Sequence, residues 1–64
     1  MTYKIEGYES QEDFDNGNNS IVKTGLATLR DALKEAGVYL FDCPIVEVIS
    51  DDEDQKVVGI VKRT

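Results

Sequence analysis

The sequence predicts an α+β fold, a small antiparallel sheet of ββαββ or βαββ order with one amphipathic helix packed on one face. Residues Thr24–Gly37 (TGLATLRDALKEAG) carry apolar side chains at helical spacing. Two runs rich in β-branched residues, Ile45–Ser50 and Lys56–Lys62, are separated by a short polar link of the length found in β-hairpins. A third run of mixed β-branched, aromatic and charged residues, Thr2–Tyr8, is typical of a strand with one face on the core.

The predicted helix should pack through one apolar stripe. Four residues at positions i, i+3, i+7 and i+10 form this stripe: Leu26, Leu29, Leu33 and Ala36. Thr24 is the favoured N-cap; the alternative is Thr28, with Asp31 three residues later in a capping-box pattern. Gly37 should end the helix, because glycine adopts the left-handed conformation common after a helix.

The segment before the helix has two interpretations. The helix could extend back to Ser20, which is a good N-cap, since Val22 continues the apolar stripe. Against this, Gly25 in a helix interior costs about 1 kcal/mol relative to alanine, and β-branched residues favour strands. We therefore expect a short strand over Ile21–Thr24.

The chain is expected to form one domain over residues 1–64, with an acidic loop at 9–19 and a C-terminal hairpin at 45–63. The loop contains Asn16-Gly17, a dipeptide that favours tight turns, and we expect a mobile loop or a frayed hairpin tip. Its one apolar residue, Phe14, could fold back onto the core or be exposed for contact with a partner. Folding back is favoured.

Both strands of the hairpin carry apolar residues on both faces: Ile45, Val46, Val48 and Ile49 in one, and Val57, Val58, Ile60 and Val61 in the other. Continuous apolar runs indicate a sheet covered on both sides. One short helix covers one side, so the N-terminal segment or a second copy should cover the other, and a homodimer is expected. Tyr39 and Phe41, in the connection before the hairpin, are expected to close one end of the core.

The charge balance limits the classes of partner. Thirteen acidic and seven basic residues give a formal net charge of −6. Such a surface repels phosphate backbones and anionic membranes and favours basic protein partners. The sequence has no apolar run of about 18 residues and no signal-peptide pattern. Together with a single unpaired cysteine, this predicts a cytoplasmic protein.

The residue types needed for chemistry are sparse. There is no histidine to activate Cys43 or to join it in a zinc site, and Cys43 is expected to be a small core residue. The acids of 51–54 lack the EF-hand spacing, and the five glycines form no phosphate-binding pattern. We therefore expect no enzymatic activity, no cofactor and no metal.

Two acidic runs are the candidate partner-binding residues: Glu9, Glu12, Asp13, Phe14 and Asp15 in the first, and Asp51, Asp52, Glu53 and Asp54 in the second. Lying side by side, they would make a negative surface able to engage a basic, nucleic-acid-binding groove of a larger protein. This predicts a small acidic non-enzymatic protein-binding module. Small phage-encoded inhibitors of host enzymes share its size, charge and coarse element order. The alternative is an assembly subunit that acts through homo-oligomerisation of its C-terminal hairpin.

Overall fold

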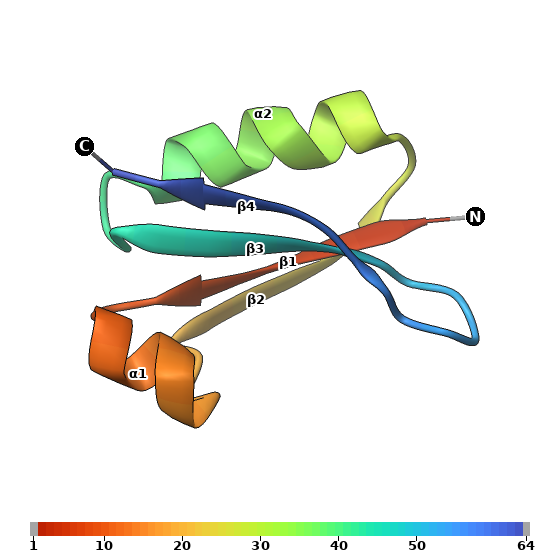
Figure 1. The fold of residues 1–64 in the computed structure, drawn as a ribbon. Helices are drawn as coiled ribbons and strands as arrows, with labels where there is room; N and C mark the ends of the chain where they lie inside the picture. Colours follow the sequence, from red (N-terminus) through yellow and green to blue (C-terminus); the bar gives the residue numbers. More distant parts are fainter. Residues whose placement is uncertain (1, 64) are drawn as a thin grey trace.

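The computed structural model of the chain describes residues 2–63; Met1 and Thr64, the ends of the predicted domain, lie outside the described residues. The elements in chain order are β1 (Tyr3–Tyr8), α1 (Gln11–Asn16), β2 (Ile21–Leu26), α2 (Leu29–Tyr39), β3 (Ile45–Ser50) and β4 (Val57–Lys62). Four antiparallel strands form one sheet, with α2 above it, running along the strands, and α1 below one end (Figure 1). The predicted α+β class is confirmed.

The strand order is β2-β1-β3-β4, so β1 and β3 are central and β2 and β4 are the edges. In the β1–β3 ladder Tyr3 lies opposite Ser50 and Tyr8 lies opposite Ile45. The segment that follows β1 and the segment that follows β3 therefore leave the sheet at opposite ends. We call the sheet face under α2 the helix face and the opposite face the outer face.

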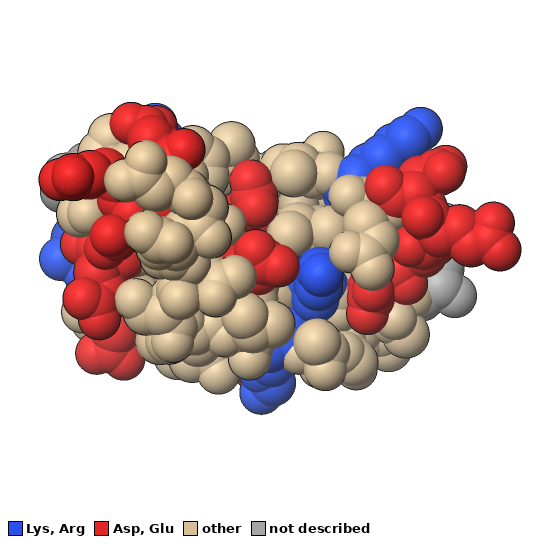
Figure 2. Space-filling model, turned by 90° about the horizontal axis from the view of Figure 1, so that it is seen from below, with Lys and Arg blue, Asp and Glu red and all other residues tan. Residues whose placement is uncertain are grey.

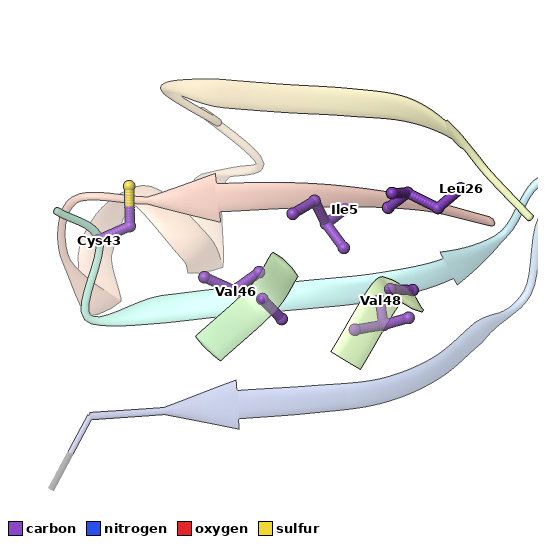
Figure 3. Packing of buried hydrophobic residues seen from close by; sticks show 7 residues of the cluster. Ile5, Leu26, Cys43, Val46 and Val48 are labelled. Atoms are coloured by element: carbon purple, nitrogen blue, oxygen red, sulfur yellow. The ribbon is translucent and has the colours of Figure 1, made fainter. Parts of the chain in front are cut away.

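The core lies between the helix face and α2. Its buried residues are Ile5, Leu26, Ala32, Ala36, Cys43, Val46 and Val48, which are drawn from close by in Figure 3. Ile5 and Val48 are directly opposed across β1 and β3, and both are fully buried. Burial of one such side chain contributes about 1.5–3 kcal/mol. These central positions therefore dominate the stability of this small domain.

The helix begins later and ends later than the favoured interpretation placed it. Thr28 is the N-cap, and its hydroxyl accepts a hydrogen bond of 3.1 Å from the Asp31 amide. Thr24 and Gly25 belong to β2 instead, because this segment pairs with β1; Gly25 has a φ of 75° that a helix excludes. The predicted strand at 21–24 is confirmed and extends to Leu26. Gly37 does not end the helix, which continues to Tyr39.

The buried stripe of α2 is also shifted from the predicted one. Ala32 and Ala36 are fully buried, whereas Leu29 and Leu33 are exposed. Alanine lets a helix lie close to the sheet, and the two leucines then lie at the side of the contact. Leu26 reaches the core, but from β2.

The acidic segment 9–19 is not a loop throughout, because residues 11–16 form the short helix α1. The Ser10 hydroxyl caps it by accepting from the Asp13 amide at 3.0 Å, and acids in its first turn favour the positive end of the helix. Gly17, with a φ of 74°, ends it in the left-handed conformation. The Asn16-Gly17 pair therefore ends a helix and does not form a hairpin turn.

The C-terminal hairpin is confirmed, but only one of its strands is buried on both faces. Every residue of β3 except Glu47 is buried, whereas β4 is an edge strand of exposed and half-buried residues. Burial of an apolar strand on both faces is thus confirmed for β3 and wrong for β4. Tyr39 packs against the core as expected, but Phe41 is 85% exposed and does not close its end.

Candidate protein-binding surface

The outer face carries one row of residues that crosses all four strands. Glu6 on β1 lies opposite Val22 on β2 and opposite Glu47 on β3, and Glu47 lies opposite Ile60 on β4. Directly opposed residues share a face of a sheet. By the same registers, the other outer-face residues are Lys4, Tyr8, Ile45, Ile49, Val57 and Lys62.

The apolar residues at both edges of this face are half exposed. Val22 on β2 is 50% exposed, and Val57 and Ile60 on β4 are 51% and 47% exposed. Between them, Ile45 and Ile49 on β3 are buried by their neighbours. The middle of the outer face therefore offers apolar surface on either side of a central carboxylate pair.

The two acidic runs lie at opposite ends of the molecule and not side by side. The first follows β1, and the second joins β3 to β4, so the length of the β1–β3 ladder separates them. Five residue steps of a strand correspond to roughly 17 Å. Figure 2, which views the outer face, shows acidic side chains gathered at both ends. A single continuous acidic patch made of both runs is therefore wrong.

At the first end, the acids lie on α1 and immediately before it. Glu9, Glu12 and Asp15 are exposed, and Asp13 is half-buried beside the Ser10 cap. Phe14 is half-buried and meets the Tyr8 ring edge to face, with ring centroids 5.1 Å apart and planes at 89°. Phe14 thus folds back onto Tyr8 and not onto the core under α2, and this contact holds α1 against the end of β1.

At the second end, Asp52 shapes the hairpin tip. Its carboxylate accepts from the Ser50 hydroxyl at 2.9 Å and from the amides of Asp54 and Gln55 at 3.0 and 3.2 Å. The Ser50 hydrogen bond is the largest cause of a lowered Asp52 pKa. Asp51 accepts from the Gln55 side chain, whereas Glu53 and Asp54 are exposed. Asp52 is therefore a structural residue of the tip, whereas the Glu53 and Asp54 side chains are exposed to solvent.

The centre of the outer face holds a carboxylate pair beneath a tyrosine hydroxyl. The Tyr8 hydroxyl donates to Glu6 Oε1 at 3.1 Å and lies 3.4 Å from Glu47 Oε1. Lys4 forms an ion pair with Glu6 at 3.5 Å, so Glu47 is the less compensated acid of the two. Burial first, and then the charge of Glu6, raises the pKa of Glu47. Burial and the two carboxylates raise the pKa of Tyr8 to about 12.

Replacing Glu47 with glutamine should stabilise the protein at pH 7 by roughly 0.2–1 kcal/mol, because like charges directly opposite each other destabilise a sheet. Because the pKa of Glu47 is higher in the folded protein than in the unfolded chain, the folded state favours the protonated side chain. The stability that this adds is fully present below the unfolded pKa of about 4.3 and is lost as the pH rises through the folded pKa. Urea denaturation of wild type and Glu47→Gln between pH 4 and 7.5 checks this. The gain should shrink as the pH falls; a gain independent of pH would contradict it.

The remaining chemical candidates do not assemble into a site. Cys43 is buried in the core as expected, and burial together with the charge of Asp42 raises its thiol pKa. Within residues 2–63, no three acidic or cysteine side chains converge as a possible metal-binding group. No helix in that part of the chain is long and apolar enough to cross a membrane.

The structure thus places the two predicted acidic runs far apart, and it brings together on the outer face residues that are distant in the sequence. The acids of 9–15 and 51–54 are split between two ends, while Val22, Glu6, Glu47 and Ile60 form one row. Alternation along each strand indicated which residues share a face. The order of the strands, which makes β1 the neighbour of both β2 and β3, was not available from that pattern.

Comparison of the chain with known protein families, characterised proteins and solved structures finds no significant match in any of the three.

Proposed function

We propose that this chain is a small acidic non-enzymatic protein-binding module whose outer face docks on a basic surface of a larger protein. One observation carries the proposal: the outer face has acids at both ends and at its centre, with half-exposed apolar side chains between them. Such a combination suits a protein partner, because apolar contacts supply affinity and opposite charges supply orientation and rate of encounter.

The arrangement sets requirements for the partner. Acidic ends roughly 17 Å or more apart need basic residues on both sides of an apolar centre. Nucleic-acid-binding surfaces present lysine and arginine side chains over this span because they follow a phosphate backbone. By occupying such a surface the module would exclude the nucleic acid, as a phage-encoded inhibitor of a host enzyme would. One buried free cysteine is consistent with action in the reducing cytoplasm.

The proposal predicts that charge reversal at the two ends abolishes partner binding. The test variant combines Glu12→Lys on α1 with Glu53→Lys at the hairpin tip; both positions are exposed, and Asp52 is left intact because it shapes the tip. The control variant combines Asp31→Lys and Asp42→Lys, which change the net charge by the same amount at exposed sites on α2 and after it. Circular dichroism should show both variants folded.

Binding is measured by affinity capture from a lysate of the source organism, with retained proteins identified by mass spectrometry. A supporting result is a protein retained by wild type and by the control variant, lost with the end variant, displaced by duplex DNA, and weakened at least about tenfold between 50 and 300 mM salt. A partner retained equally by the end variant, or one that binds independently of salt, would refute the proposal.

A further inference from the structure

The outer edge of β4 has unpaired backbone groups. On its inner edge, the Arg63 amide donates to the Pro44 carbonyl at 2.8 Å. Backbone groups alternate in direction along an antiparallel strand, so the amide and carbonyl groups of Ile60 and Lys62 point away from β3. A free edge of this kind is a template for pairing with another strand.

The side chains of this edge do little to prevent pairing. Edge strands are usually protected by charges or proline, but the five residues from Val57 to Val61 contain neither. An irregularity in the register opposite Val57 shortens the regular edge at its start, and Lys62 is the charged residue at its end. Val58 and Ile60 are 46% and 47% exposed.

We propose that β4 pairs antiparallel with β4 of a second copy of this chain, about a twofold axis at Ile60, to form a continuous eight-stranded sheet. In this register Ile60 exchanges two hydrogen bonds with Ile60 of the partner subunit, and Val58 lies opposite Lys62 of the partner subunit. Moving the axis to Gly59 would instead set Lys62 opposite Lys56 of the partner subunit, and like charges in that position destabilise the pair.

The charges of the hairpin favour a second copy as the occupant. In this register Arg63 of the partner subunit lies opposite Val57, three residues after Asp54, the last acid of the tip. Symmetry repeats this approach of opposite charges at the other end of the junction. In an alternative dimer formed by stacking two outer faces, the acidic ends of one copy would lie against the acidic ends of the other and repel them. The edge therefore suits self-association, and the outer face stays open in the dimer. The first proposal uses side chains of the outer face and this one uses the backbone edge of β4; Ile60 belongs to both, and sedimentation of the pure protein tests the dimer alone.

The first test is sedimentation velocity of the pure protein from about 1 µM to 1 mM, because a junction of two short strands is small and should give a micromolar dissociation constant. Ile60→Lys sets two lysines beside each other at the axis and should weaken the dimer at least tenfold. Val22→Lys is the control, at a similarly exposed outer-face position on the opposite edge, and should change the constant less than twofold. A wild-type protein that stays monomeric to about 1 mM overturns the proposal.

A second test examines the register and does not depend on a charged variant folding. Opposed residues in a hydrogen-bonded antiparallel pair have Cα atoms about 5.5 Å apart, within disulfide range. Ile60→Cys should therefore form a covalent dimer under mild oxidation. Wild type, with only the buried Cys43, should not, and Val57→Cys, which lies three residues from the axis, should react at least tenfold more slowly. Equal rates for Val57→Cys and Ile60→Cys would overturn the register.

Discussion

Replacing Ile5 with alanine is expected to remove about 2–5 kcal/mol of stability and to leave much of the protein unfolded at 25 °C. Ile5 is fully buried at the centre of β1, between Lys23 of β2 and Val48 of β3, on the face covered by α2. A domain of 64 residues has a total stability of roughly 3–10 kcal/mol, so the loss of this one side chain is comparable with the whole. Urea denaturation followed by circular dichroism measures the loss.

A matched pair of valines supplies the control for this prediction. Val48 is fully buried and Val22 is 50% exposed, yet both lie in strands of the same sheet. Val48→Ala should cost more than 1 kcal/mol, whereas Val22→Ala should stay within about 0.5 kcal/mol. If Val22→Ala costs as much as Val48→Ala, the outer face is as tightly packed as the helix face, contrary to the structure.

Replacing Gly7 with alanine should destabilise the protein by about 1–3 kcal/mol, whereas the same change at Gly59 should stabilise it by about 0.4–1 kcal/mol. A β-carbon at Gly7 would lie 2.9 Å from the Cys43 sulfur and 3.2 Å from its β-carbon, so packed side chains must shift. A β-carbon at Gly59 meets nothing within 4 Å. Both glycines lie inside strands, so the loss of backbone entropy on folding is similar for the two substitutions. The difference between their changes in stability therefore measures the effect of packing.

The contact partner of Gly7 can be tested by a double-mutant cycle. Cys43→Ala removes the sulfur that a Gly7 β-carbon would meet, so Gly7→Ala should cost at least 0.5 kcal/mol less in that background. Equal costs in both backgrounds would show that the penalty arises elsewhere. Stabilisation by Gly7→Ala in the wild-type background would contradict the close packing altogether.

Local patterns of the sequence were sufficient for most of the elements. The runs at 45–50 and 56–62 predict both strands of the hairpin, and the strand at 21–24 is confirmed. The short helix α1 was missed, although Ser10 with Asp13 three residues later and Gly17 at its end are N-cap and C-cap signals. A loop was the simpler interpretation because this segment is mostly polar. No residue of α1 is buried, so its sequence lacks the apolar spacing of about 3.6 residues by which a helix is recognised.

The helix shows why an apolar pattern does not identify the contact face. Leu29 and Leu33 are larger than Ala32 and Ala36, so a stripe of leucines was the stronger signal. The sheet instead accepts the alanines, because close approach of α2 over Ile5 and Val48 needs small side chains at the contact. The leucines then remain beside the contact, exposed.

The sequence alone determined the α+β class, the strand positions, the net charge and the places where acids are concentrated, because these follow from local spacing and composition. The tertiary structure decided the strand order β2-β1-β3-β4, which no local pattern encodes, since it depends on contacts between residues far apart in the chain. That order separates the two acidic runs, buries β3 and leaves β4 as an open edge. The same residues therefore form a two-ended acidic face in place of one continuous patch.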